Sequence, residues 1–153
     1  MCALRDLPHG IPAPPHAHVP GVNARHAEDW FDQIKQSVTP EIPATHLHLT
    51  AAWTTGIAYL KAGYFWECHE VLEAVWMQTR DGTAERDMVQ ALIQLANARL
   101  KQRMGRPQAA WRLCNMVHAH LSRCPIDRAI LGLNVPDVQS WVRATEAEVR
   151  HQK

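Results

Sequence analysis

The segment from Gly63 to Trp76 reads GYFWECHEVLEAVW, and its spacing of apolar residues is typical of a helix that is largely buried. Wound at about 100° per residue, the segment gathers one set of side chains within an arc of roughly 120°: Phe65, Trp66, His69, Leu72, Glu73 and Trp76. A second apolar flank holds Cys68, Val71 and Val75, which leaves Glu67, Glu70 and Ala74 on the side expected to face water. This pattern predicts that His69 and Glu73 lie on an aromatic, buried face.

An imidazole and a carboxylate on a buried face need partners. Leaving either unsatisfied would cost roughly 1–3 kcal/mol. His69 and Glu73 could hydrogen-bond each other, reach polar groups on a neighbouring helix, or converge on a cation. The segment alone leaves these three possibilities open.

The same residues resemble a known family. His69, Glu73 and Trp76 fit the HxxxExxW pattern of the bacterial and archaeal family catalogued as domain of unknown function 309, and the lead-in from residue 63 to 70 is similar as well. Downstream, residues 91–96 resemble the second helix of that family, and residues 105–110 resemble its next turn and helix start. The resemblance covers residues 53–121 and implies an all-helical fold. It implies no activity, because the family is uncharacterised, but a metal-binding role has been suggested for its His/Glu motif.

Helical periodicity extends over most of the chain, and alternating strand patterns are absent. Helices are expected at 24–38, 45–62, 63–76, 83–104, 107–123 and from Asp137 onward. Gly63 suits the C-cap of the second of these, Thr83 the N-cap of the fourth, and Pro107 the first turn of the fifth. We therefore expect an all-α, single-domain bundle of about five to six helices. Its centre would be an antiparallel hairpin of residues 45–62 and 63–76.

Residues 1–23 have a different composition. They hold five prolines and three histidines, with few large apolar side chains, which resists helix and strand alike. We expect an N-terminal arm over 1–23 that is dispensable for stability, followed by one helical domain over 24–153.

The helix expected at 83–104 carries a polar stripe formed by Arg86, Gln90, Gln94, Asn97 and Lys101. This stripe is the natural partner for His69 and Glu73, so the predicted pocket comprises Glu67, His69, Glu70, Glu73, Trp76, Arg86, Gln90 and Gln94. Two interpretations of it compete. In the first, Arg86 and the glutamines satisfy His69 and Glu73 in a network without an ion. In the second, His69 and Glu73 chelate a divalent metal ion, although two strong ligands are fewer than most tight sites use.

Composition limits the remaining possibilities. The chain of 153 residues carries a net charge of +1, has no apolar run of about 18 residues, and has four widely spaced cysteines, so we expect a cytoplasmic protein without a membrane segment or disulfides. Residues 88–126 contain several basic residues and no acid, which we interpret as compensation for the acidic first half rather than as a nucleic-acid surface. A monomer or a small homo-oligomer is expected.

Two functional hypotheses follow. One is a binding module whose His/Glu/Gln pocket recognises a small ligand or a protein partner. The other is a metal-dependent, hydrolase-like enzyme with His69 and Glu73 as metal ligands and Glu70 as base. Comparison with HExxH zinc proteases is weak, because Glu73 replaces the second histidine. No nucleophile elbow, phosphate loop or dinucleotide fingerprint supports an enzyme, so catalysis stays undecided at this point.

Overall fold

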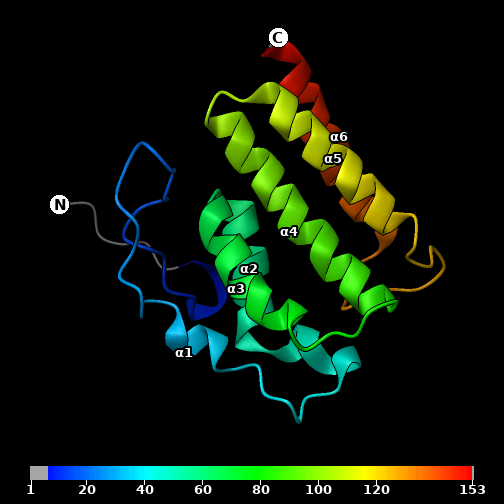
Figure 1. The fold of residues 1–153 in the computed structure, drawn as a ribbon. Coiled ribbons are helices and arrows are strands. Elements are labelled where there is room, and N and C mark those ends of the chain that lie inside the picture. The colour runs from blue at the N-terminus through cyan, green and yellow to red at the C-terminus, as the bar shows by residue number, and fades with distance from the viewer. Residues whose placement is uncertain (1–6, 153) are drawn as a thin grey trace.

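The computed structural model describes residues 7–152, and this part of the chain is built from helices (Figure 1). The long elements are α2 (Ala51–Ala62), α3 (Phe65–Trp76), α4 (Ala84–Arg103), α5 (Pro107–Leu121) and α6 (Val135–His151). Shorter ones precede them: η1 (Pro8–Gly10), α1 (Asp32–Lys35) and η2 (Ala44–Leu49). Pairing within residues 7–152 is limited to isolated bridges, so the prediction of an all-α bundle is confirmed.

Helices α2 and α3 form the expected hairpin, and two glycines make it possible. Gly63 ends α2 in the left-handed region with φ 89°, a conformation that glycine adopts without a steric penalty. Gly56 lets the two helices approach closely, because a Cβ added there would lie 2.5 Å from Leu72 Cδ2. The turn and the close contact together fix how α3 sits on α2.

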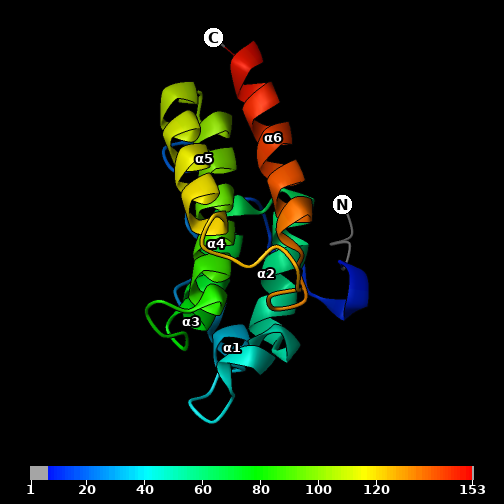
Figure 2. The same cartoon turned by 90° about the vertical axis from the view of Figure 1, so that its right-hand side faces the viewer.

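The remaining long helices extend the bundle away from this hairpin (Figure 2). Helix α4 packs against both α3 and α5, and α6 returns along α5. As predicted, the Thr83 hydroxyl accepts a hydrogen bond from the backbone N–H of Arg86 at the start of α4, and Pro107 lies in the first turn of α5. None of the helices in the described residues is long and apolar enough to cross a membrane.

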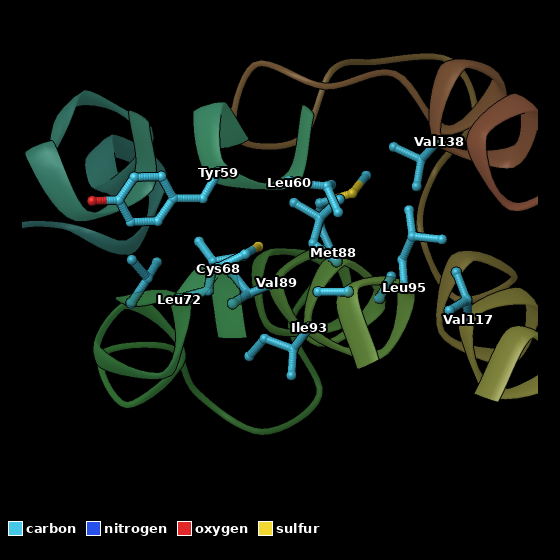
Figure 3. Packing of buried hydrophobic residues seen from close by; sticks show 14 of the residues in the cluster. Tyr59, Leu60, Cys68, Leu72, Met88, Val89, Ile93, Leu95, Val117 and Val138 are labelled. Atoms are coloured by element: carbon cyan, nitrogen blue, oxygen red, sulfur yellow. The ribbon is translucent and has the colours of Figure 1, made fainter. Parts of the chain in front are cut away.

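The core lies where α2, α3 and α4 meet and continues between α4, α5 and α6 (Figure 3). Tyr59 from α2 and Leu72 from α3 are completely buried, as are Met88 and Leu95 from α4. Val117 and Val138 carry the same core to α5 and α6. Burial of this kind contributes about 25 cal/mol per Å² of apolar surface and dominates the stability of the fold.

Three local predictions are wrong. The helix expected at 24–38 is a single turn at Asp32–Lys35, because residues 24–27 have no regular structure and carry His26 to a buried partner on α3. The helix expected at 45–62 begins only at Ala51, because residues 44–49 form a separate 3-10 helix that ends at Leu49, which is 71% exposed. The last helix begins at Val135 after Asn134 rather than at Asp137, since Pro136 suits its first turn.

The N-terminal arm is packed against the bundle from residue 7 onward, although it has few large apolar side chains; its dispensability for stability stays a prediction. Ile11 and Val19 are each 8% exposed and belong to the core. The Tyr59 hydroxyl donates a hydrogen bond of 3.0 Å to the carbonyl of Pro12. Residues 1–6 lie outside the described residues.

Candidate functional site

Helix α3 is rotated relative to the orientation expected from its sequence. Its buried residues are Phe65, Glu67, Cys68, Val71, Leu72 and Val75. Glu67, expected to face water, is completely buried, whereas Glu73, expected on the buried face, has a side chain that is 55% exposed. The physical reason is that α3 packs against both α2 and α4, and the arm covers the side of α3 on which Glu67 lies.

The buried carboxylate of Glu67 is held by the arm and the segment that follows it. Its Oε2 accepts a hydrogen bond of 2.8 Å from the backbone N–H of His18 and lies 2.6 Å from Nε2 of His26. The His26 side chain is 2% exposed and packs edge-on against Phe31. Glu67 Oε1 and His26 Nδ1 have no hydrogen-bond partner within the described residues. No sequence pattern predicted this pair, because its members come from segments with no common periodicity.

His69 and Glu73 instead occupy the outer side of α3. Their closest nitrogen and oxygen atoms are 3.9 Å apart, and the side chains are 28% and 55% exposed. Glu70 lies beside them and accepts a hydrogen bond of 3.1 Å from Lys35 Nζ. These three predicted site residues are therefore in contact with solvent rather than enclosed in the bundle.

At the C-terminal end of α3, Trp76 meets the first turn of α4. The guanidinium carbon of Arg86 lies 3.9 Å from the centre of the Trp76 ring, a cation–π contact. Arg86 Nη1 donates to the carbonyl of Thr79 at 2.9 Å, and its Nε lies 3.2 Å from Asp81. Bonds to the Thr79 carbonyl and to Asp81 thus hold the guanidinium over the indole ring.

This contact forms part of a surface pocket of about 400 Å³. Its lining comes from α3, α4, the turn between them and the end of α5: Trp76, Asp81, Gly82, Arg86, Asp87, Gln90, His120 and Arg123. On its far side Asp87 lies 2.9 Å from His120 Nδ1 and accepts a hydrogen bond of 3.2 Å from Arg123. Trp76 Nε1 is buried and has no hydrogen-bond acceptor within the described residues.

The structure brings three of the eight predicted site residues together in this pocket, namely Trp76, Arg86 and Gln90. Gln94, one turn further along α4, accepts a hydrogen bond of 3.4 Å from Asn97 instead. Sequence reasoning missed His120 and Arg123. His120 lies in the last turn of α5 and Arg123 just beyond it, more than 40 residues after Trp76, and no spacing rule links them to Trp76. The lack of acidic residues between 88 and 126 was the one available signal, since it makes the exposed end of α5 basic.

His69 and Glu73 are the residues that the sequence predicted as ligands of a metal ion. Together they supply two donors, one of them on a half-exposed side chain. Structural and catalytic sites for zinc use three or four protein ligands. In the described residues, no group of three or more His, Cys, Asp or Glu side chains is arranged to hold a metal ion. The donor set does not fit a tight metal site.

The cysteines of the described residues are also poorly suited to nucleophilic chemistry. Cys68, Cys114 and Cys124 are free and buried. Burial raises the pKa of Cys114 and that of Cys124 to about 11 each, and it raises the pKa of Cys68 further. A thiol in this state carries very little thiolate at neutral pH, and the thiolate is the reactive form.

Comparison with known proteins gives one family. Residues 53–113, which run from the first turn of α2 into α5, match the family described as Domain of unknown function (DUF309). No curated protein matches the chain. No solved structure matches it either.

Proposed function

Since residues 53–113 match a family whose description assigns no activity, we propose a function from the geometry alone: the protein binds a small polar ligand that carries an anionic oxygen group. The ligand enters the pocket bounded by Trp76, Arg86 and Gln90. This makes the protein a binding module.

The observation that carries the proposal is the unpaired N–H of Trp76. An indole N–H that is buried usually has an acceptor, and leaving it without one is unfavourable. Trp76 Nε1 has no acceptor within the described residues, although it belongs to a side chain that lines a surface pocket. A ligand oxygen that reached this atom would remove the penalty. The Arg86 guanidinium covers the ring and would have to shift, which its 24% exposed side chain allows.

Hydrogen-bond donors outnumber acceptors in the pocket, which favours a ligand rich in oxygen. A guanidinium offers five N–H donors, and Arg86 and Arg123 use only some of theirs on protein acceptors. Of the two acidic residues, Asp87 is already engaged by His120 and Arg123, and the Asp81 side chain is 96% exposed. Carboxylates and phosphates are the groups that arginine recognises best, because their oxygens match its planar fork.

Thermal unfolding in the presence of simple anions tests the proposal. A ligand that binds only the folded state raises the melting temperature by an amount that grows with its concentration. We expect inorganic phosphate or acetate to raise the melting temperature beyond the effect of chloride at equal ionic strength, and Arg86→Met to abolish this increment. Arg112→Met is the matched control, because Arg112 is exposed on α5 outside the pocket. An increment that is the same in Arg86→Met and wild type, or no increment in wild type, would refute the proposal.

A further inference from the structure

A second and larger cavity lies on the other side of the hairpin, between the arm, the outer face of α2 and the connector before α6. Its volume is about 540 Å³, within the range of small-molecule sites. The walls are mainly apolar and include Ile11, Trp53, Ile57, Leu131 and Leu133. Figure 2 shows η1 beside α2 and the connector between α5 and α6 passing in front of α2. We call this cavity the α2 groove.

One wall of the α2 groove is a strained turn. Ile130 and Leu133 exchange two backbone hydrogen bonds of 2.8 and 3.0 Å, which closes a two-residue hairpin loop. Both central residues have positive φ, 52° at Leu131 and 77° at Gly132. Such turns usually have Asn or Gly at the first central position, because a branched, bulky side chain is disfavoured there. Leu131 is nevertheless 5% exposed and lines the groove. Strain of this kind persists at ligand sites, where the strained residue shapes the wall.

The ionisable side chains that line the α2 groove are all basic. Its lining contains Lys61, His9 and His48 and no acidic residue. The Lys61 ammonium lies 5.8 Å above the centre of the Trp141 ring and has no carboxylate partner within the described residues. By contrast, Lys35 is paired with Glu70. Nδ1 of His48 is also buried, and it has no hydrogen-bond partner within the described residues. An apolar cavity that has at its edge a cation without a carboxylate partner is complementary to an amphipathic anion.

We infer that the α2 groove binds a medium-chain aliphatic carboxylate, with the chain against Trp53, Ile57 and Leu131 and the carboxylate at Lys61. The hydrophobic contribution scales with the apolar surface removed from water, so the alkyl chain supplies affinity. The Lys61 ammonium supplies the preference for a carboxylate over a neutral head group. This inference is independent of the pocket bounded by Trp76, Arg86 and Gln90, which shares no lining residue with the α2 groove.

Calorimetric titration of the full chain with octanoate and with octanol tests the inference. Wild type should bind octanoate at least about tenfold more tightly than octanol, a difference of roughly 1.4 kcal/mol. Lys61→Met should bring the two affinities together by weakening octanoate binding alone. Lys101→Met removes the same charge from α4, outside the groove, and should change neither affinity. Arg86→Met should also change neither, which separates this site from the Trp76 pocket.

A second measurement locates the ligand. In an NMR titration of wild type, octanoate should shift the methyl signals of Ile57 and Leu131, and the shifts should reach saturation. Ala58→Trp, which fills the groove, should abolish binding of both octanoate and octanol. Circular dichroism of each variant checks that it folds. The inference is overturned if wild type binds octanol as tightly as octanoate, if Lys61→Met keeps the wild-type octanoate affinity, or if wild type binds neither ligand.

Discussion

Glu67 on α3 and His26, which lies 41 residues earlier, form a completely enclosed pair in which Oε2 and Nε2 are 2.6 Å apart. The same oxygen accepts the backbone N–H of His18, so one carboxylate holds the arm and the following segment on the hairpin. Separately, the Tyr59 hydroxyl bonds to Pro12. The N-terminal segment from residue 7 is therefore part of the folded unit.

Removal of the Glu67 carboxylate should destabilise the protein strongly. Breaking a buried pair leaves its partner without compensation, and such changes typically cost several kcal/mol. We expect Glu67→Ala to lower the free energy of unfolding by about 3 kcal/mol, measured by urea denaturation. Glu67→Gln should lose less, because its amide oxygen can still accept the N–H of His18.

Glu70 provides the control on the same helix. It is paired with Lys35 at the surface, and the two side chains are 22% and 34% exposed. Exposed ion pairs contribute at most about 1 kcal/mol, so Glu70→Ala should change stability much less than Glu67→Ala. Equal losses in the two variants would mean that the burial of Glu67 is wrong.

His69 and Glu73 should contribute little to stability. Their 3.9 Å separation and exposed side chains are typical of a surface i,i+4 pair, which is worth about 0.3–0.5 kcal/mol. His69→Ala and Glu73→Ala should therefore each cost under about 1 kcal/mol and be nearly additive. A double-mutant cycle measures this. A coupling energy above about 1 kcal/mol would instead support the buried network interpretation of the sequence.

Periodicity predicted the long helices because each carries a continuous apolar stripe. The C-cap Gly63, the N-cap Thr83 and the first-turn residue Pro107 marked where helices end or begin. Periodicity could not orient α3. Apolar residues occur nearly all round this helix, so the hydrophobic pattern leaves two faces almost equivalent, and the arm decides which one is covered. For a related reason, only part of the candidate pocket could be predicted from the sequence. Trp76, Arg86 and Gln90 follow local helical spacing, whereas His120 and Arg123 reach the pocket only through the packing of α5 on α4.

The close approach of α2 and α3 makes Gly56 sensitive to substitution. A methyl group there would overlap Leu72, because the added Cβ would lie 2.7 Å from Cγ as well as 2.5 Å from Cδ2. Overpacking of a core typically costs 1–3 kcal/mol, so we expect Gly56→Ala to destabilise by about 2 kcal/mol despite the better helix propensity of alanine. Gly56→Ala combined with Leu72→Ala should recover part of the overlap penalty. Chemical denaturation of Gly56→Ala, Leu72→Ala and the double variant measures the effect, and a stabilised Gly56→Ala would contradict the hairpin geometry.

Stability should fall at alkaline pH. The pKa values of Cys114 and Cys124 are raised by burial from an ordinary value of 9.0 to about 11, and that of Tyr59 is raised by burial and by the nearby Glu67 charge. The unfolded chain therefore releases these protons at lower pH than the folded chain. The contribution is fully present below about pH 9 and is lost between about pH 9 and pH 11. Urea denaturation at pH 8 and pH 10 measures the fall. The fall in the free energy of unfolding should be smaller in a Cys114→Ala/Cys124→Ala variant. An equal fall in that variant would contradict its assignment to these thiols.

The most direct measurement for the proposed function is the indole N–H signal of Trp76 in a ¹H–¹⁵N NMR titration with inorganic phosphate. The chain has six tryptophans, and the signal of Trp76 is identified by its loss in Trp76→Phe. We predict that this signal moves with saturation as phosphate is added, that the other indole signals move less, and that Arg86→Met removes the response. A Trp76 signal that does not move, or that moves equally in Arg86→Met, would contradict ligand binding at this pocket.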